Sequence, residues 1–99
     1  MFHLSLITPG GKIFDADIEY LRAPGTEGSL GILSRHTAML TLTKKDVLMV
    51  RHDNKEAYFA TGPGILEVGP DHSVLLLADE ALPAKDTEEA HEKLKALKR

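Results

Sequence analysis

Short segments of alternating apolar and polar residues fill most of this chain, and turn-forming residues interrupt them about every eight to twelve residues. A period of two places alternate side chains on opposite faces of a strand, so each segment is typical of a half-buried strand. The segment at residues 47–51 is apolar on both faces, as expected of an inner strand. We expect strands at residues 2–8, 12–17, 18–23, 38–43, 47–51, 56–61, 65–68 and 73–78. This spacing predicts an all-β sandwich or barrel rather than βαβ units.

The residue pattern changes after residue 84. Residues 86–89 resemble a capping box, in which Asp86 or Thr87 caps a helix that has acidic residues in its first turn. The apolar stripe of this segment is narrow and consists of Ala90, Leu94 and Leu97. A helix of about three turns is marginally stable alone, so we expect it to lie on the sandwich or on a partner.

A glycine-rich stretch occupies residues 23–36. Its glycines recur every third residue, at Gly25, Gly28 and Gly31. Glycine tolerates a positive φ and a close backbone approach, so we expect neither a helix nor a plain strand here. We expect an ordered segment of turns at a sheet edge, anchored to the core by Leu30, Ile32 and Leu33. Apolar anchors in such a loop indicate a fixed surface, which we interpret as a docking surface for another protein.

The composition excludes several classes of site. The 99 residues suffice for one modest core, and the absence of cysteine removes disulfides and thiolate zinc sites. A net charge of −3 argues against nucleic acid as a partner, because binding phosphates requires clustered Lys and Arg. The longest apolar run, residues 74–78, is too short to cross a bilayer. We therefore expect a chain kept in a soluble phase, with any membrane contact made through a partner.

Two groups of side chains raise the question of a metal site. The five histidines are His3, His36, His52, His72 and His91. None lies two or four residues from another, so surface histidines are the favoured interpretation. Asp15, Asp17 and Glu19 alternate and would share one strand face, where a solvated face is favoured over a calcium site. We expect no metal and no cofactor.

No catalytic motif is complete in the sequence. The glycine-rich stretch lacks the Lys-Ser/Thr of a P-loop and the Gly-x-Gly-x-x-Gly of a dinucleotide site. Ser34 lies near His36, but there is no Gly-x-Ser-x-Gly elbow around a nucleophile. We therefore expect no catalytic activity, and a small hydrolase that uses Ser34 and His36 is the least favoured function.

Residues 23–33, followed by His36, resemble the signature of the epsilon subunit of F-type ATP synthases, which is called delta in mitochondria. Three further segments agree with that family in the same order: Thr8-Pro9 at the end of the first strand, Gly-Ile-Leu-Glu-Val at residues 64–68, and Val-Leu-Leu-Leu-Ala-Asp at residues 74–79. The resemblance spans residues 2 to about 92.

The resemblance implies both a fold and a role. It implies a two-sheet antiparallel β-sandwich at residues 1–84 followed by a C-terminal helical hairpin. The sequence ends at Arg99, within what would be the first helix of that hairpin, so we expect a mainly β chain with a single short C-terminal α-helix at residues 85–99. It further implies a non-catalytic subunit of the central stalk that binds the gamma subunit and rests on the membrane c ring, coupling ion translocation to ATP synthesis or hydrolysis. The expected location is the cytoplasmic face of the bacterial inner membrane, reached through these partners.

By position, the resemblance assigns the loop that contacts the c ring. Its residues are Glu27, Gly28, Ser29, Gly31 and His36. The chain departs from the family pattern at Ser34-Arg35, where Pro-Gly is usual, at Asp46, where a turn glycine is usual, and at Pro63, where a Gly-Gly pair would begin. Contacts with the gamma subunit are expected on one sandwich face and on strand edges.

The C-terminal segment also departs from the family pattern. Some bacterial members bind ATP with an Asp-x-x-Arg-Ala segment, and residues 88–92 here read Glu-Glu-Ala-His-Glu. The arginine fork for phosphate is missing and Glu92 adds like charge, so we expect no useful ATP binding. Relatives have two C-terminal helices and can inhibit ATP hydrolysis by extending them. A single helix of about 13 residues reaches only about 20 Å, so we expect weak or no inhibition.

One alternative function from another class remains open. A free-standing β-sandwich could bind a peptide or a small ligand. Such a module would show a concave apolar pocket and no affinity for the gamma subunit.

Overall fold

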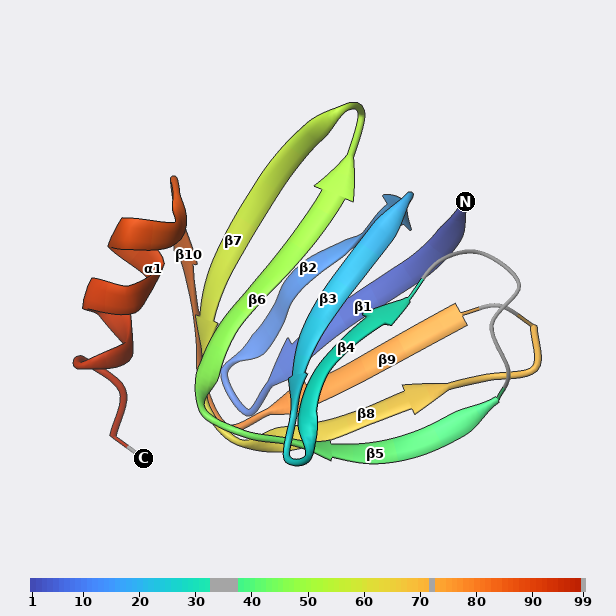
Figure 1. Cartoon of the computed structure of the whole chain (residues 1–99). Helices are drawn as coiled ribbons and strands as arrows, with labels where there is room; N and C mark the ends of the chain where they lie inside the picture. Colours follow the sequence, from blue (N-terminus) through green and yellow to red (C-terminus); the bar gives the residue numbers. More distant parts are fainter. Residues whose placement is uncertain (33–37, 72, 99) are drawn as a thin grey trace.

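The computed structural model describes residues 1–32, 38–71 and 73–98. Within these residues there are ten β-strands and one α-helix (Figure 1). The strands are β1 (Phe2–Thr8), β2 (Gly11–Ile18), β3 (Tyr20–Gly25), β4 (Gly28–Ile32), β5 (Met39–Thr43), β6 (Asp46–His52), β7 (Lys55–Thr61), β8 (Gly64–Val68), β9 (Ser73–Ala78) and β10 (Ala81–Ala84), and the helix is α1 (Thr87–Leu94). The expected mainly β fold with one short C-terminal helix is confirmed.

The strands form two layers that are joined at one corner. Hydrogen-bonded neighbours follow the order β10-β7-β6-β3-β5-β8-β9-β1-β2, and β4 pairs with β3. β3 and β5 share one paired position, Gly25 with Thr43, so the path divides there. We call β10, β7, β6, β3 and β4 the first sheet, and β5, β8, β9, β1 and β2 the second sheet.

One strand pair departs from the expected antiparallel arrangement. β1 and β9 are parallel neighbours, with Leu4 opposite Val74 and Leu6 opposite Leu76. The other strand pairs among the described residues are antiparallel. Short hairpin turns impose antiparallel pairing, whereas β1 and β9 are separated by most of the chain and are free of that constraint.

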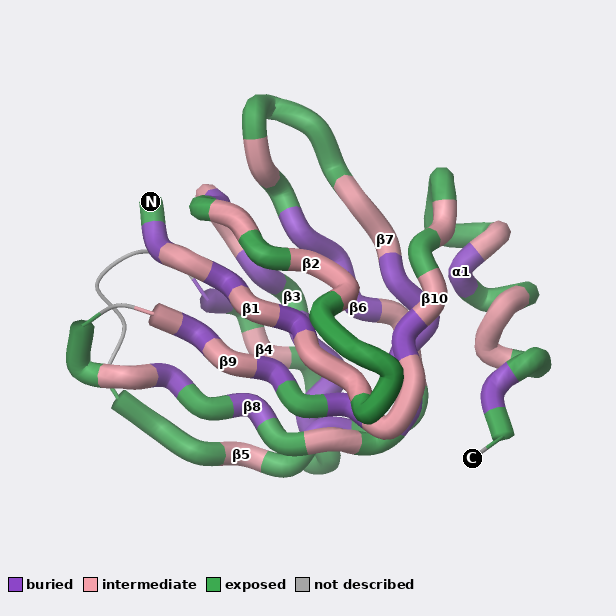
Figure 2. The backbone as a smooth tube through the Cα atoms, turned by 180° about the vertical axis from the view of Figure 1, so that it is seen from behind, coloured by how far each residue is buried: buried purple, intermediate pink, exposed green. Residues whose placement is uncertain are grey.

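The hydrophobic core lies between the two sheets. Buried and more exposed positions alternate along β1, β8 and β9, as the colour bands of Figure 2 show. Leu6, Leu66 and Leu76 from the second sheet and Leu48 from the first are at most 1% exposed. Burying one such side chain stabilises a fold by about 1.5–3 kcal/mol. The ring of Phe14 also meets the ring of Phe59 edge to face, 5.7 Å between centroids, and so joins β2 to β7 across the layers.

The glycine-rich stretch forms a β-hairpin. The expectation that it contains no plain strand is wrong, because β3 extends to Gly25 and β4 covers residues 28–32. The two strands pair from Leu21 with Ile32 to Gly25 with Gly28, and Gly28 has a φ of 135° that favours glycine. The expected edge position is confirmed, because within the described residues β4 pairs with β3 alone.

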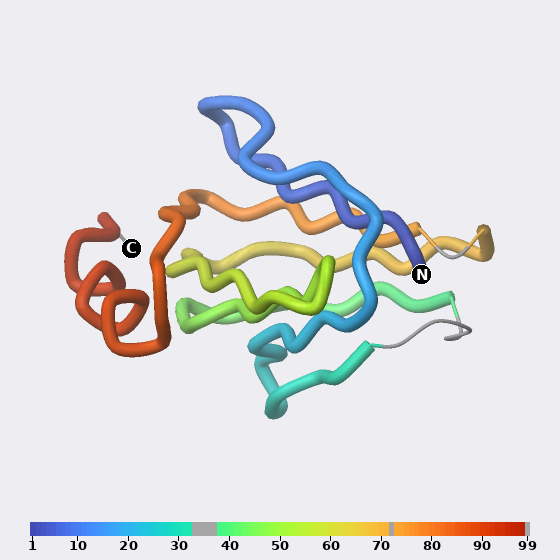
Figure 3. Tube along the Cα trace, turned by 90° about the horizontal axis from the view of Figure 1, so that it is seen from above, coloured from blue at the N-terminus to red at the C-terminus, as the bar shows by residue number. Residues whose placement is uncertain are grey.

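Helix α1 is shorter than expected and packs on the first sheet. It spans eight residues, capped by Asp86, whose carboxylate accepts a hydrogen bond of 2.8 Å from the backbone N–H of Glu89. It contacts β6, β7 and β10, with Ala90 fully buried, and isolated turns then bring Leu97 back onto the fold. Figures 1 and 3 show α1 at the opposite end of the strands from the N-terminus. No helix in the described ranges has the length and apolar character to span a bilayer.

Two further boundaries differ from expectation. β2 runs on to Ile18, and the break before β3 falls at Glu19, whose carboxylate accepts a hydrogen bond from the backbone N–H of Asn54. The short strand β10 was not expected, because it contains Pro83, which cannot donate to a neighbouring strand. The structure accommodates this proline on an edge strand that pairs with β7.

We expect Gly64→Ala to destabilise the protein by at least about 2 kcal/mol. A Cβ at this position would lie 2.1 Å from the carbonyl oxygen of Leu77, so the backbone of β8 or β9 would have to move. Urea denaturation measures the change in the free energy of unfolding.

Gly10→Ala is the matched control for this substitution. Its Cβ would lie 3.7 Å from the Thr8 hydroxyl, an ordinary contact, and we expect a change within about 1 kcal/mol. Equal stability of the two variants would contradict the close approach of β8 and β9.

Candidate docking surfaces

A row of apolar side chains crosses the outer face of the second sheet. Leu42 of β5 pairs with Ile65 of β8, Ile65 with Leu77 of β9, and Leu77 with Ile7 of β1. Leu42, Ile65 and Leu77 are 58%, 42% and 45% exposed, and Leu40, two residues along β5, is 70% exposed. We call these five residues the apolar outer face.

This arrangement is unusual for a surface that meets only water. Single exposed apolar residues are common on proteins, but contiguous patches mark interaction sites. Four adjacent strands at a spacing of about 4.8 Å make this row about 14 Å wide. The next row also holds apolar side chains, with Leu40 opposite Glu67 and Glu67 opposite Leu75. The apolar outer face is therefore a candidate docking surface.

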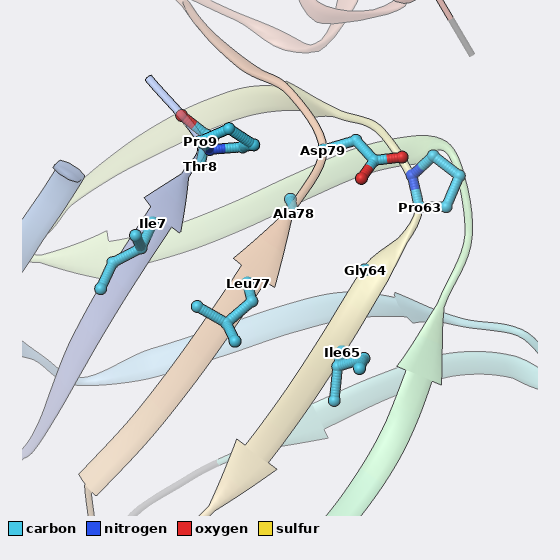
Figure 4. A pocket seen from close by; sticks show the side chains of 9 residues that line it. All are labelled: Ile7, Thr8, Pro9, Pro63, Gly64, Ile65, Leu77, Ala78 and Asp79. Atoms are coloured by element: carbon cyan, nitrogen blue, oxygen red, sulfur yellow. The ribbon is translucent and has the colours of Figure 1, made fainter. Parts of the chain in front are cut away.

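A groove lies at one end of the apolar outer face. It encloses about 400 Å³ between the ends of β1 and β9 and the start of β8. Figure 4 shows its lining, which includes Ile7, Pro9, Pro63, Ile65 and Leu77, together with the carboxylate of Asp79. Its mainly aliphatic lining suits an apolar side chain of a partner.

The opposite end of the same face carries a charged cluster. The two ring nitrogens of His3 contact two carboxylates: Nε2 lies 2.5 Å from Asp15 and Nδ1 lies 2.9 Å from Asp17. Ser5 Oγ and Lys12 Nζ also donate to Asp15, at 2.8 and 3.1 Å. We call these five residues the His3 cluster.

The contacts within the His3 cluster favour the charged forms of its members. Hydrogen bonds to Asp17 and then Asp15 raise the pKa of His3 above its ordinary value. Hydrogen bonds from His3, Lys12 and Ser5 hold the pKa of Asp15 well below its usual range. The cluster is exposed, with 44% of the His3 side chain accessible, so solvent and salt weaken these pairs.

The glycine hairpin is the second candidate surface. Glu27, Gly28, Ser29 and Gly31 are exposed on it, while His36 lies outside the described residues. Of the expected anchors, Ile32 is buried at 3% exposure and Leu30 is half-buried against the core, and Leu33 lies outside the described residues.

The hairpin tip is fixed to the second sheet. The backbone N–H of Thr26 donates to the carbonyl of Leu42 at 3.1 Å, and that of Lys44 donates to the carbonyl of Pro24 at 2.8 Å. Leu42 belongs to the apolar outer face, so the two candidate surfaces adjoin at β5.

The outer face of the first sheet has a different character. Arg51 and Glu56 form an ion pair at 3.1 Å, the Tyr58 hydroxyl donates to Glu56 at 2.7 Å, and the Arg51 guanidinium lies 5.5 Å from the centre of the Tyr20 ring. The hydrogen bonds from Tyr58 and Arg51 lower the pKa of Glu56. Since α1 covers part of this sheet, the second sheet offers the larger uncovered apolar surface.

The other sequence candidates do not converge on a site. Asp15 and Asp17 lie together but bind His3, whereas Glu19 turns to Asn54, so the three acids do not share one face. His52 packs edge to face on Phe14. Ser34, His36 and His72 lie outside the described residues, and within those ranges no group of three or more acidic or histidine side chains is placed to hold a metal ion.

Known proteins identify the family. A family model described as "ATP synthase, Delta/Epsilon chain, beta-sandwich domain" matches residues 1–84. The chain belongs to this family. The ATP synthase epsilon chain of Nitrosomonas europaea is 39% identical over 93 residues, covering 91% of this chain and 64% of that relative. The epsilon chain of Pelotomaculum thermopropionicum is 33% identical over 87 residues, covering 88% of this chain and 64% of that relative. The chain thus spans less than two thirds of the length of these relatives.

Two solved structures share the fold with this family member. A chain in the Tetrahymena thermophila mitochondrial ATP synthase central stalk and c ring matches with a TM-score of 0.72 and 21% identity, over 82% of this chain and 65% of that chain. A chain in the Euglena gracilis mitochondrial ATP synthase (OSCP/F1/c-ring) matches with a TM-score of 0.79 and 20% identity, over 96% of this chain and 62% of that chain. Both confirm the β-sandwich.

Sequence reasoning missed the apolar outer face and the His3 cluster. Both depend on which strands are neighbours, and the parallel pairing of β1 with β9 has no local signal. The turn at residues 9–11 signals the β1–β2 hairpin but sets a register with Ile7 opposite Lys12. A β-bulge between Leu6 and Ile7 then shifts the register by one residue and places His3 opposite Asp17 and Ser5 opposite Asp15, and nothing in the sequence indicated this bulge.

We expect the contribution of the His3 cluster to stability to fall at both ends of the pH range. The pKa of His3 is raised above 6.5, so its contribution is complete below pH 6.5 and is lost as pH rises through the raised pKa. The pKa of Asp15 is lowered below 3.8, so its contribution is present above pH 3.8 and is lost as pH falls through the lowered value. His3→Gln should therefore lower the urea midpoint most between about pH 4 and pH 6.5.

His91→Gln, at an exposed position on α1 outside the His3 cluster, serves as the control for the loss of an imidazole and should not reproduce the fall in the urea midpoint expected of His3→Gln. If His3→Gln and wild type differ by the same amount at every pH, the ion-paired state of His3 is refuted.

Proposed function

We propose that this chain is a non-catalytic subunit of the rotor in an F-type ATP synthase, linking the gamma subunit to the membrane c ring. The observation that carries the proposal is the apolar outer face beside a fixed glycine hairpin, in a chain of the delta/epsilon family. Such a subunit couples ion translocation to ATP synthesis or hydrolysis by transmitting torque, which requires stiff contacts rather than a reactive site.

We assign the gamma subunit to the apolar outer face. Docking there would remove Leu40, Leu42, Ile65 and Leu77 from water, at about 25 cal/mol for each Å² of apolar surface buried. The groove beside Pro63 offers a recess for an apolar side chain of gamma, of the kind that anchors many interfaces.

We assign the c ring to the glycine hairpin. Glu27, Gly28, Ser29 and Gly31 present backbone and small polar groups, which suit the polar loops of a membrane ring. We retain His36 in this surface on the strength of the family resemblance. Contact with the ring would hold the subunit at the cytoplasmic face of the bacterial inner membrane.

We further propose that residues 1–84 form the functional β-sandwich and that residues 85–99 are an appendage to it. A groove beside α1 is lined by Glu88, Glu89 and Glu92 together with Lys85 and Asp86, so its charge disfavours the phosphates of ATP. Glu89 also forms an ion pair of 3.4 Å with Lys93, so the ammonium of Lys93 is already paired with a carboxylate. That this segment binds no ATP usefully therefore stays our prediction.

The groove supports a second candidate function. A free-standing module for a peptide or small ligand would use a concave apolar pocket, and the space between Ile7, Pro63 and Leu77 is one. Membership of the delta/epsilon family favours the rotor subunit. Binding to gamma separates the two functions, because the free-standing module would not bind it.

Leu77→Asp should weaken binding to the cognate gamma subunit by more than about 30-fold, because docking would bury an unpaired carboxylate. Leu77 is 45% exposed in the free chain, so we expect little change in its melting temperature. Titration calorimetry of the purified chain with gamma measures the affinity.

Ala96→Asp introduces the same charge at an exposed position beyond α1 and should leave the affinity for gamma unchanged. If both variants bind gamma as tightly as wild type, gamma does not dock on this face.

Glu27→Lys should reduce the ions pumped per ATP hydrolysed by the assembled enzyme about twofold or more, because it reverses a charge on the surface assigned to the c ring. Binding of the free chain to gamma should not change. Ion uptake and ATP hydrolysis are measured in the same membrane vesicles.

Glu92→Lys, an exposed residue on α1, is the control for this charge reversal. Normal coupling in Glu27→Lys, or an equal loss in Glu92→Lys, would argue against the hairpin as the contact with the ring.

A further inference from the structure

The apolar outer face and the His3 cluster lie on the same side of the second sheet. Ile7, Ser5 and His3 alternate along β1 on this side, whereas Leu4 and Leu6 between them point into the core. A strand rises about 3.3 Å per residue, so His3 lies about 13 Å from Ile7.

A partner docked on the apolar outer face would reach His3. A standard interface covers about 800 Å² on each protein, equivalent to a disc of about 16 Å radius. A disc of that size centred on the row from Leu42 to Ile7 includes His3 or borders it.

This end of the face is negatively charged. The charged groups around His3 are Lys12, Asp15 and Asp17 of β2, and Asp71, which accepts a hydrogen bond from Ser73 beside His3 on β9. Glu67 of β8 lies farther along the same face, in the row of Leu75 and Ser5. Four carboxylates and one ammonium leave a net negative charge whether or not His3 is protonated. Charge complementarity therefore favours a partner that carries Lys or Arg here.

The geometry around His3 requires its protonated form. Both ring nitrogens face carboxylate oxygens, and a carboxylate accepts but does not donate, so both nitrogens must carry hydrogen. A neutral imidazole has one N–H and could bond only one of the two acids. Loss of the proton would therefore break the hydrogen bond of His3 to one of the two acids. Asp15 would still accept hydrogen bonds from Lys12 and Ser5, whereas Asp17 is the more exposed of the two.

We propose that docking of the gamma subunit on the apolar outer face is linked to deprotonation of His3, with a Lys or Arg of the partner replacing the imidazolium beside Asp17. The inference rests on the function proposed above. A partner cation and the imidazolium repel each other, and burial in the interface also disfavours the charged ring. The complex therefore binds the His3 proton less tightly than the free chain, and docking releases it.

The effect on affinity follows from this linkage. Release of a proton on binding makes the affinity rise with pH, by at most tenfold for each pH unit while His3 titrates. We expect an increase of about three- to tenfold between about pH 6 and pH 8.5, flattening above the pKa of His3 in the free chain.

Titration calorimetry of the full chain with the cognate gamma subunit, at a series of pH values, tests the proposal. Repeating it in buffers of different ionisation enthalpy counts the protons released. We expect wild type and His91→Gln to release up to one proton and to gain affinity with pH, and His3→Gln to show neither effect. The melting temperature of each variant verifies that it is folded.

Each outcome has one meaning. If gamma binds with the same pH dependence to wild type and to folded His3→Gln, the His3 linkage is refuted and the rotor function stands. An affinity of the wild-type chain that falls or stays level as pH rises refutes the linkage equally. If gamma does not bind the folded chain at any pH, the proposed function fails and the linkage fails with it.

Discussion

The register between paired strands is the constraint on which this structure depends. In the second sheet it sends Leu4, Leu6, Leu66 and Leu76 into the core and their neighbours outward. Slipping one strand by one residue would exchange these two sets. The core and the apolar outer face are thus two consequences of one register. When one residue of a strand points into the core, the next residue along that strand must point to the outer face. The close approach of β8 and β9 at Gly64 locks this register at one end.

The position of the glycine hairpin is determined by the corner between the two layers. The chain turns from β5 into β6 at residues 44–45, and the tip of the glycine hairpin is hydrogen bonded to Leu42 just before that turn and to Lys44 within it. A hairpin with three glycines would otherwise have a large conformational entropy to lose on docking. Holding its tip through Thr26 and Pro24, and burying Ile32, removes much of that cost before a partner arrives.

Local signals in the sequence predicted most of the fold but little of the candidate surfaces. Alternation and turn residues located β1, β6, β7 and β9, and Asp86 was one of the two expected helix caps. The glycine stretch was misjudged because strand pairing with β3 outweighed the low strand propensity of glycine. The row from Leu42 to Ile7 required the neighbours of each strand, which arise from contacts between distant segments. The family resemblance supplied the expected partners, but not the face that we assign to gamma.

The central claim is that a partner covers the outer face of the second sheet, and the absence of cysteine from the chain allows a direct measurement. A single cysteine introduced as Leu77→Cys, or as Ala96→Cys for comparison, can be labelled with a maleimide in the presence and absence of the gamma subunit. We expect gamma to slow the labelling at position 77 strongly and to leave position 96 unaffected. Equal labelling of position 77 with and without bound gamma would contradict this account.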